Sequence, residues 1–560
     1  MKNGYAGLCS VIGTGALIVV VMVVGGERSV RAGNDAADEA LATIRPEAIR
    51  ADMQFLADDL LEGRATGARG HEIAAKFMAA EFESMGLDPA GETGTYFQNV
   101  SLRSFRADEE RTTLTLVRGE KVQALAFRQD FVTIGDPGRA DTAVEAPVVY
   151  VGLGVTAPDQ NYDDYAGVDA KGKIVTYVFG APPRFEATMR AHYSSGVIKA
   201  ANAVAHGALG MVLLYSPALE ELYPFKDRVR DLVFPEKRWM DAQGRPNDYF
   251  PELRGTAVMN MAAAAKGFQG SGKSADEIYA AAKSGRPSSL ALPVSARIRV
   301  VSKLEDIHSP NVVARLKGSD SKLSDEYVVY TAHLDHLGIG EAVNGDKIYN
   351  GALDNASGSA CLLEVARAYS RMKPRARRSI LFVSVTGEED GLLGSAYFAH
   401  HPTVAKDHLV ADINVDGNLA LLWPIADVTA RGREHSTLGA AVREAGARLN
   451  FQVSPDPLPE LVLFIRSDQY SFVKEGIPAV LLSTGIKSSN PKIKPDEILP
   501  MWMRTLYHKP QDDMNQRFDF ESGAKFTRYC FLVGYVVARQ DERPTWNPGD
   551  FFGEQYGNRH

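Results

Sequence analysis

The stretch EYVVYTAHLDHLG, residues 326–338, ends an apolar run with groups that can bind a metal ion. An apolar, β-branched run is typical of a buried parallel strand, and open α/β sheets place their chemistry just beyond the carboxyl ends of such strands. His333 and Asp335 alternate along the extended chain, so both side chains can point to one side. Later segments, most of them following a predicted strand, add the candidate ligands Asp354, Glu388, Glu389, Asp416 and His508.

These residue types suit a hydrolytic site with two metal ions. Zinc takes imidazole and carboxylate ligands, and a catalytic zinc site keeps one position open. Two ions about 3.5–4 Å apart need a bridging group, usually a carboxylate. Asp354 lies in the Gly-rich loop GALDNASG and can offer both oxygens where a longer side chain would crowd. The adjacent pair Glu388-Glu389 allows one carboxylate to bind metal while its neighbour acts as general base for the attacking water.

The motifs resemble the zinc aminopeptidase family related to bacterial leucyl aminopeptidase, glutamate carboxypeptidase and the transferrin receptor, over roughly residues 50–539. The resemblance implies two Zn²⁺ ions per chain, one bound by His333 and Asp416 and the other by Glu389 and His508, with Asp354 as the bridge. It further implies that Glu388 is the general base and that Asp335 orients His333 by accepting its ring N–H. Every position of the family pattern is filled by the expected residue type.

The resemblance also implies an α/β fold with a mixed, mostly parallel central sheet flanked by helices, the zinc exopeptidase-like α/β/α sandwich. From about Asp141 the pattern changes to short strands joined by Gly/Asp turns, and DYAGVDAKGKIV resembles a smaller, β-rich protease-associated domain. We therefore expect a catalytic domain in two parts, 40–138 and 295–540, around an insert at 139–294, with a C-terminal tail at 541–560. Within the insert, residues 217–292 predict an extended arm or lid over the active site, or else an ordinary long surface loop.

The amino-terminal residues have the outline of a signal peptide. Lys2 gives a positive start, residues 11–26 are almost wholly apolar, and Val30-Arg31-Ala32 offers a cleavage site. We expect residues 1–32 to direct export to the periplasm or the extracellular space. An uncleaved segment would instead anchor the protein in a membrane. With 62 basic and 70 acidic residues and a net charge of −8, the composition gives no case for nucleic-acid binding. The sequence does not fix the oligomeric state.

The stretch LVLFIRSDQYSFVKEGIPAVLLSTG resembles the family segment that borders the substrate pocket, and Ser467 and Asp468 match its Ser-Asp pair. One position departs from the family. In the bacterial aminopeptidases a Tyr that helps to hold the developing oxyanion lies three residues before this Ser, where the present chain has Phe464. Tyr470 or Tyr507 could replace it, or zinc alone could polarise the carbonyl.

The function that follows is hydrolysis of N-terminal residues from peptides with a free N-terminus, by a water that the metals activate and Glu388 deprotonates. The same ligand set serves carboxypeptidases, in which Arg466 could pair with a substrate carboxylate. A glutaminyl cyclase shares the fold with one zinc but usually lacks the insert. A receptor-like binding protein keeps the architecture without activity, and lost ligands would mark that case. None is lost here.

Three further residues receive a supporting interpretation. His336 follows His333 by three residues and is expected to support the site rather than to bind metal. Asp512, four residues after His508, is expected to support that turn. His71, at a predicted helix start, is interpreted as a solvated first-turn residue.

Overall fold

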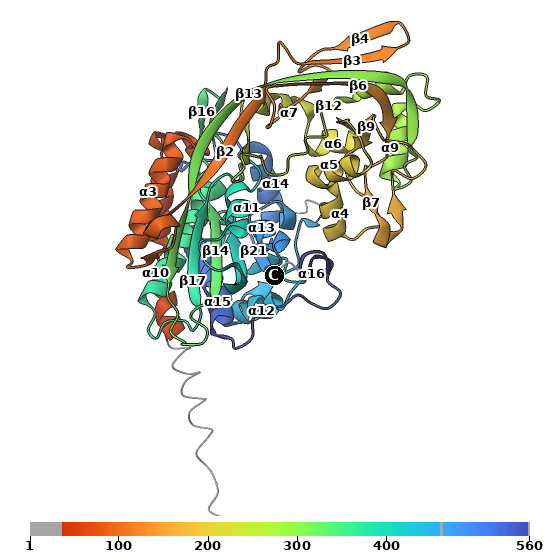
Figure 1. Cartoon of the computed structure of the whole chain (residues 1–560). Coiled ribbons are helices and arrows are strands. Elements are labelled where there is room, and N and C mark those ends of the chain that lie inside the picture. The colour runs from red at the N-terminus through yellow and green to blue at the C-terminus, as the bar shows by residue number, and fades with distance from the viewer. Residues whose placement is uncertain (1–35, 460–462, 558–560) are drawn as a thin grey trace, which may run out of the picture.

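The computed structural model describes residues 36–459 and 463–557. The expected signal peptide at residues 1–32 lies outside these described residues. The chain forms a larger lobe around one sheet and a smaller lobe beside it, and strand β13 arches between them (Figure 1). Within the described ranges, none of the helices combines the length and the apolar character that a membrane crossing requires.

Four parallel strands form the centre of the larger sheet. In spatial order they are β17 (Ser379–Val385), β14 (Tyr327–His333), β18 (Leu409–Val415) and β21 (Ala479–Thr484). All their residues are buried because helices cover both faces, which explains their continuous apolar runs. Antiparallel strands extend the sheet at both sides: β13 (Leu290–Leu316), β2 (Phe97–Ala107) and β11 (Glu236–Trp239) beyond β17, and β19 (Asp427–Arg431) beyond β21. Short β1 (Asp88–Pro89) and β20 (Gln452–Val453) pair with β13 and β19.

Alternate residues of the central strands enter two separate apolar cores. Val328 and Tyr330 of β14 face one core, whereas Tyr327 and Val329 face the other. The first core is covered by α2 (Pro46–Leu56), α3 (Arg69–Ser84), α10 (Ser357–Arg371), α12 (Leu438–Arg448), α14 (Pro495–Thr505) and α15 (Phe520–Arg539). The second is covered by α11 (Leu393–His400), α13 (Gln469–Lys474) and α16 (Phe551–Tyr556). The expected mixed, mostly parallel sheet flanked by helices is confirmed. The expected C-terminal tail contains α16, whose Phe552 is fully buried.

The insert forms a second sheet that begins earlier in the chain than its expected start at residue 139. Its strands, in spatial order, are β4 (Lys121–Leu125), β3 (Thr113–Arg118), the first part of β13, β6 (Asp141–Tyr150), β9 (Ile174–Val178), β10 (Gly210–Leu214), β12 (Thr256–Met259) and β5 (Phe131–Val132). The expectation that residues 113–132 belong to the catalytic domain is therefore wrong. An alternating pattern predicts a strand but does not specify which sheet the strand joins.

The single strand β13 takes part in both sheets. Its residues 290–301 pair with β6, residues 302–312 pair with β2, and residues 312–316 pair with β17. Continuous backbone hydrogen bonding thus runs from the insert into the catalytic sheet, and the two lobes share a strand rather than a loop.

The segment 217–292 is neither an extended arm nor one long surface loop, which corrects that expectation. It forms α6 (Pro217–Leu222), α7 (Phe225–Asp231), β11, β12, α8 (Met261–Phe268) and α9 (Ala275–Lys283). β11 pairs with β2, whereas α8 and α9 pack into the insert core. Local capping supports the last two helices, because Asn260 caps α8 and the Ser274-Glu277 capping box opens α9.

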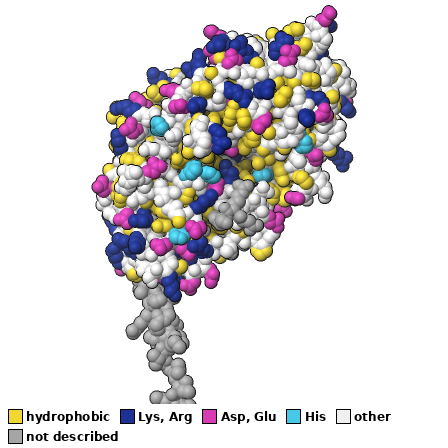
Figure 2. Space-filling view, in the orientation of Figure 1, with side chains coloured by type: hydrophobic (Ala, Val, Ile, Leu, Met, Phe, Trp, Pro, Cys, Tyr) yellow, Lys and Arg dark blue, Asp and Glu magenta, His cyan; other side chains and the backbone are white. Residues whose placement is uncertain are grey.

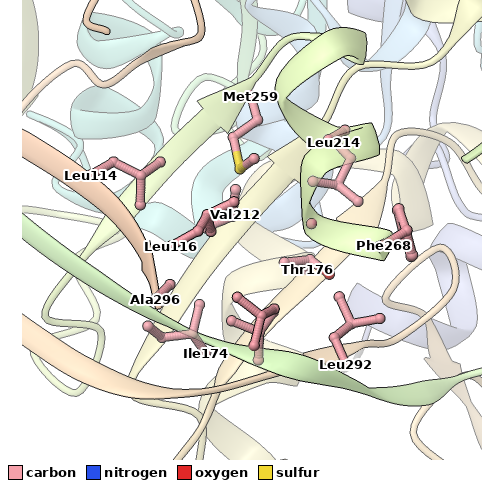
Figure 3. Close-up of a pocket in the computed structure, with 14 residues that line it drawn as sticks. Leu114, Leu116, Ile174, Thr176, Val212, Leu214, Met259, Phe268, Leu292 and Ala296 are labelled. Atoms are coloured by element: carbon pink, nitrogen blue, oxygen red, sulfur yellow. The ribbon is translucent and has the colours of Figure 1, made fainter. Parts of the chain in front are cut away.

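Two cavities differ in size and lining. A cavity of about 20 Å³ inside the insert is lined almost entirely by apolar side chains, with Thr176 as the polar exception (Figure 3). A cavity of about 1070 Å³ lies between one face of the insert sheet, α7 and the strands that lead to the larger lobe. The space-filling view is hollowed where the lobes meet, and hydrophobic side chains gather there (Figure 2).

The insert also contacts the larger lobe through α4 (Ala187–Ser194), which is followed by α5 (Gly196–Ala205). His192 Nδ1 lies 3.4 Å from the hydroxyls of Tyr470 and Tyr556. The insert is therefore held at its far end as well as through β13.

Candidate metal centre

The candidate ligands meet because the central strands are parallel and end at one edge of the sheet. His333 is the last residue of β14, Asp416 follows β18 directly, and the Glu388-Glu389 pair follows β17. Asp354 comes from the loop before α10, and His508 comes from the turn after α14. Strand ends thus supply four of the groups, and two helix connections close the site from the side.

His333 and two carboxylates form the first half of the centre. Its Nε2 lies 3.2 Å from Asp354 Oδ1 and 3.2 Å from Asp416 Oδ1. Its Nδ1 faces Asp335, at 3.2 Å from the backbone oxygen and 3.9 Å from carboxylate Oδ1. This arrangement leaves Nε2 as the nitrogen that faces the carboxylate pair.

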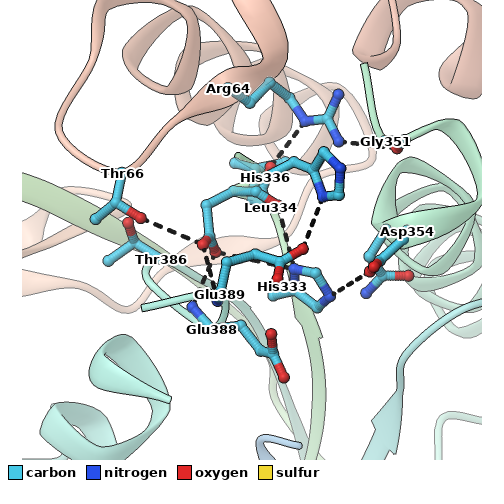
Figure 4. A network of polar contacts seen from close by, with 12 residues as sticks. Arg64, Thr66, His333, Leu334, His336, Gly351, Asp354, Thr386, Glu388 and Glu389 are labelled. Carbon is cyan, nitrogen blue, oxygen red and sulfur yellow. Dashed lines mark hydrogen bonds and ion pairs between the residues drawn. The ribbon is translucent and has the colours of Figure 1, made fainter. Parts of the chain in front are cut away.

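The second half is built around the other oxygen of Asp354. His508 Nε2 lies 3.2 Å from Asp354 Oδ2 and 3.1 Å from Glu389 Oε2. This nitrogen is buried, yet neither contact has hydrogen-bond geometry. Glu389 Oε1 lies 2.7 Å from Nδ1 of His336, which is also buried (Figure 4).

The geometry fits metal binding. In a tetrahedral zinc site with bonds of 2.0–2.1 Å, neighbouring ligand atoms lie about 3.3 Å apart, close to the separations seen here. A buried imidazole nitrogen that approaches two carboxylates without hydrogen bonding is well placed to share a cation with them. Two sets have ligand atoms within 4.8 Å of one another: His333, Asp354 and Asp416, and His336, Asp354 and Glu389. The second half therefore has two histidines at hand, whereas the sequence predicted only His508 as a ligand.

Asp335 holds more than His333. Its Oδ1 accepts a hydrogen bond from the backbone N–H of Glu388 at 3.1 Å, and its Oδ2 accepts from the N–H of Glu389 at 3.3 Å. Thr66 donates its hydroxyl to Oδ2 at 3.2 Å. Burial raises the pKa of Asp335 to about 6, although His333 opposes the shift. One carboxylate thus fixes the main chain that carries both glutamates.

The electrostatic environment separates Glu388 from the bridging aspartate. Burial raises the pKa of Glu388 well above its ordinary value, with His333 opposing and Asp416 adding to the shift. Burial would also raise the pKa of Asp354, but its contacts with His333 and His508 hold that pKa well below the ordinary value. In the described residues the Glu388 side chain takes part in no hydrogen bond or ion pair, so its carboxyl is available for proton transfer.

Ser467 and Asp468 lie beneath the site in a buried polar layer. Ser467 Oγ accepts from Asn414 Nδ2 at 2.8 Å. Asp468 is fully buried, its carboxylate oxygens have no hydrogen-bond partner, and burial raises its pKa to about 7. Arg466, the neighbouring residue, is exposed.

Tyr507, Tyr470 and Phe464, the aromatic residues considered for the oxyanion position, lie in three different surroundings. The Tyr507 ring stacks on His508 with centroids 3.8 Å apart. Burial raises the pKa of its phenol, and the carboxylates of Asp354 and Glu389 raise it further. Tyr470 instead points toward His192 of the insert. Phe464 packs against His435 and Phe552, outside the ligand cluster. Of the three, Tyr507 is the one beside the metal ligands.

One of the supporting interpretations needs correction, and another is extended by the structure. The backbone N–H of Asp512 donates to Lys509 O at 3.0 Å and so supports the turn after His508. Its Oδ2 also accepts from the backbone N–H of Asp354 at 3.0 Å and holds the loop of the bridging residue. His71 is fully buried beside Ser309 Oγ at 3.2 Å, and burial lowers its pKa to about 3. It packs inside the fold because the first turn of α3 faces strand β13 rather than solvent.

Arg64 is a site residue that the sequence interpretation missed entirely. Its guanidinium is buried and contacts the loops that carry His333 and Asp354 (Figure 4). The Gly-rich loop LEGRATGARG that contains it offered no sign of a partner about 270 residues away.

Part of this chain is similar in sequence to known proteins. Residues 311–532 match the model of peptidase family M28. A probable zinc metalloprotease of Pyricularia oryzae is 38% identical over 109 residues, which are 20% of this chain and 20% of that protein. The rat (Rattus norvegicus) aminopeptidase NAALADL1 is 34% identical over 125 residues, which are 21% of this chain and 15% of that protein. The matches thus span a fifth or less of these curated relatives.

A solved structure shows the same fold over nearly the whole chain. The aminopeptidase from Aneurinibacillus sp. strain AM-1 superposes with a TM-score of 0.53 and 20% identity, covering 92% of this chain and 99% of that one. The match to the family model contains His333, Asp354, Glu388, Glu389, Asp416 and His508. Residues 311–532 are therefore similar to peptidase family M28, and this stretch contains all of the candidate metal ligands.

Proposed function

We propose that this chain is a metallopeptidase that removes N-terminal residues from peptides, with two zinc ions bound at the cluster described above. The observation that carries this proposal is the pair of 3.2 Å contacts that join one carboxylate, Asp354, to the imidazoles of His333 and His508. His333 and Asp416 would hold one ion, and Glu389 and His508 would hold the other, with His336 close enough to contribute. The bound ions would supply Lewis-acid polarisation of the scissile carbonyl and lower the pKa of the attacking water.

Glu388 would move the proton. Its carboxyl lies beside the cluster without a bonded partner, and its raised pKa brings it toward the range in which a general base works near neutral pH. It would take a proton from the water as the new C–O bond forms. It would then give that proton to the amine nitrogen as the C–N bond breaks. Asp335 would keep Glu388 in place by accepting a hydrogen bond from its backbone N–H.

Tyr507 would donate a hydrogen bond to the oxygen that gains negative charge. Its raised pKa keeps the phenol protonated and therefore able to donate. Its ring is positioned by stacking on His508. It would take the part of the family tyrosine that Phe464 replaces, because Phe464 is engaged in a separate aromatic cluster.

The exposed guanidinium of Arg466 supports a second candidate, a carboxypeptidase of the same fold. It influences the pKa of the Tyr507 phenol, so it lies on the site's side of the molecule, where it could pair with a substrate carboxylate. This alternative differs from the first in which end of the peptide is anchored, not in the metal chemistry.

One experiment addresses both candidates. Chain lacking residues 1–32 would be analysed for metal content and assayed with aminoacyl-arylamides and with N-blocked peptides that have a free C-terminus. We expect about two zinc ions per chain and hydrolysis of the free-amine substrates alone. Hydrolysis of the blocked peptides alone would favour the carboxypeptidase, and a chain without bound metal would overturn the proposal.

We also propose export, on the basis of the apolar run and small-residue site within residues 1–32. Amino-terminal sequencing of protein recovered from outside the cytoplasm should give a start just after Ala32. A start at Met1 in a membrane fraction would favour the retained anchor instead.

A further inference from the structure

Arg64 is almost completely buried, at 1% exposure, and its guanidinium is surrounded by main-chain carbonyl oxygens. Nε donates to Leu334 O at 2.8 Å, Nη1 donates to Asn350 O at 2.6 Å, and Nη2 donates to Gly351 O at 3.0 Å. Nη1 also donates to Leu56 O. The described residues offer it no ion pair. Burying a cation without an ion pair costs free energy of folding, which the hydrogen bonds to these carbonyls must offset.

The carbonyls that Arg64 binds lie on the two segments that carry metal ligands. Leu334 stands between His333 and Asp335, and Gly351 lies three residues before Asp354. Between them the chain leaves the site as a hairpin, β15 (Gly338–Val343) and β16 (Asp346–Tyr349). Arg64 therefore adds a direct tie between the two ends of this excursion, next to the Gly338–Tyr349 pair at the base of the hairpin.

The backbone of the same loop adds a second tie. The carbonyl of Arg64 accepts from the N–H of His336 at 3.2 Å. Gly63, just before it, has φ of +70°, and a Cβ there would lie 2.4 Å from Tyr349 O and 2.7 Å from Gly338 O. Only glycine lets the loop approach the hairpin this closely. Gly63 and Arg64 together thus fix the close contact between this loop and the hairpin.

Arg64 also contributes charge. The carboxylates that act on its guanidinium are those of Asp335, Asp512, Asp354 and Glu389. A fixed cation near this group offsets the repulsion among buried carboxylates that must remain close together when no metal is present. Arg suits the position because its planar fork presents five donors from three nitrogens in fixed directions, whereas the three donors of a Lys share one nitrogen.

We infer that Arg64 is a positioning residue of the metal centre, which fixes the His333 and Asp354 segments at metal-binding distance by bridging their backbone carbonyls. The inference rests on the proposed metal site but concerns residues outside the ligand set. It predicts an effect on metal affinity that exceeds any effect on overall folding, because residues that orient metal ligands typically alter affinity 10- to 100-fold when replaced.

The chain offers a matched control in Arg378, which is also fully buried. Arg378 donates to the carbonyls of Val537 and Asp541, both at 3.0 Å, and to Glu326. It precedes β17, at the end of the strand opposite to the glutamates. Replacing it removes a buried arginine that also bridges backbone carbonyls, here with an ion pair to Glu326, without touching the site.

The test measures zinc affinity by competition with a chromophoric chelator in the wild type, Arg64→Met, Arg64→Lys and Arg378→Met, alongside thermal midpoints. Visible spectra of the cobalt-substituted proteins would report ligand geometry. We expect both Arg64 variants to lose at least tenfold in affinity and to change the cobalt spectrum. Arg378→Met should lower the midpoint and keep wild-type affinity and spectrum.

Wild-type affinity and an unchanged cobalt spectrum in a folded Arg64→Met would overturn the inference. If that variant does not fold, Arg64→Lys decides, because it retains the charge and loses the fork; wild-type affinity there would equally overturn it. A wild-type chain that binds no metal would instead refute the proposed function, so the two failures are distinguishable.

Discussion

In both the catalytic sheet and the insert sheet, parallel strands end at one edge. The two edges differ in the types of residue that follow these strands. In the catalytic sheet β14, β17 and β18 lead into imidazole and carboxylate side chains. In the insert, β9, β10 and β12 lead into Phe179, Tyr215 and Asn260. The polar residues at that edge cap helices: Ser216 caps α6 and Asn260 caps α8. Parallel strands thus provide a place where side chains converge, and the residue types decide whether the place becomes a site.

The edges also differ in how they treat buried charge. The catalytic edge gathers carboxylates such as Glu388 and Asp468, whose pKa values burial raises. In the insert, Lys199 and Asp164 are buried, but each is bonded within the insert, Lys199 to Gly180 O at 2.7 Å and Asp164 to the N–H groups of Leu153 and Val155. Buried charge in the first region thus gathers around the proposed metal centre, whereas these two buried charges of the second are held by hydrogen bonds within the insert.

The largest expected effect breaks the chemistry at the catalytic edge. Glu388→Gln should reduce turnover about 1,000-fold, because it removes the proton acceptor. It should keep the metal content of the wild type and raise the thermal midpoint of the metal-free protein, because a buried carboxyl becomes a neutral isostere. Glu389→Gln should lose metal. Turnover assays and metal analysis of the two variants check this; metal loss in the first and retention in the second would show that the two roles are reversed.

The next effect concerns two tyrosines, Tyr507 beside the metal ligands and Tyr470 against the insert. Tyr507→Phe should lower kcat about 100-fold with little change in KM, as loss of one oxyanion donor does. Tyr470→Phe, which removes a hydroxyl that faces His192 of the insert, is the control and should leave kcat unchanged. Steady-state kinetics would reject the assignment if the two variants behaved alike.

A third change removes buried charge from the insert. Burial lowers the pKa of Lys199 from 10.5 to about 7, so between these values the unfolded chain binds the extra proton and the folded state loses stability as the pH falls. Lys199→Met should therefore stabilise the protein by about 1–3 kcal/mol near pH 7, and the gain should fade toward pH 10.5. Urea unfolding at several pH values measures it.

The control for that change is catalytic. Turnover and metal content of Lys199→Met should match those of the wild type, because the amine lies within the insert. A loss of activity would mean that the insert's buried charge acts on the site after all.

The smallest expected effect tests whether the polar residues at the insert edge have only a structural role. Ser216→Ala removes the side-chain acceptor for the N–H of Leu219 and should cost about 1 kcal/mol. Zinc affinity should not change. An altered affinity, measured with the same chelator competition, would contradict the division between the two edges.

The sequence predicted the parts of this molecule that local pattern determines. His333 and Asp335 could be placed on one strand end because alternation along a strand is local, and Asp354 could be singled out by its Gly-rich loop. The ligand set itself rested on the family resemblance. The structure adds the distances, with both His333 and His508 at 3.2 Å from Asp354.

The residues that were missed depend on contacts between distant segments. Arg64 reaches Leu334 across 270 residues, and its acceptors are backbone oxygens, which leave no trace in side-chain type. His336 was expected to support the site, but its contact with Glu389, 53 residues further along the chain, could not be predicted from local pattern. The insert boundary failed for a related reason, because the pairing of β3 with β13 is fixed by tertiary contacts and not by the alternation within β3.

The shared strand β13 has a consequence for how this protein can change. At 27 residues it is about 90 Å long when extended, and it belongs to the backbone ladders of both lobes, with β6 in the insert and with β2 and β17 in the larger sheet. Replacing the insert by another domain would therefore require a cut within β13, and not only within loops. Recombination that swaps the insert must carry the strand with it, and movement between the lobes must be absorbed as twist along β13 instead of rotation at a hinge.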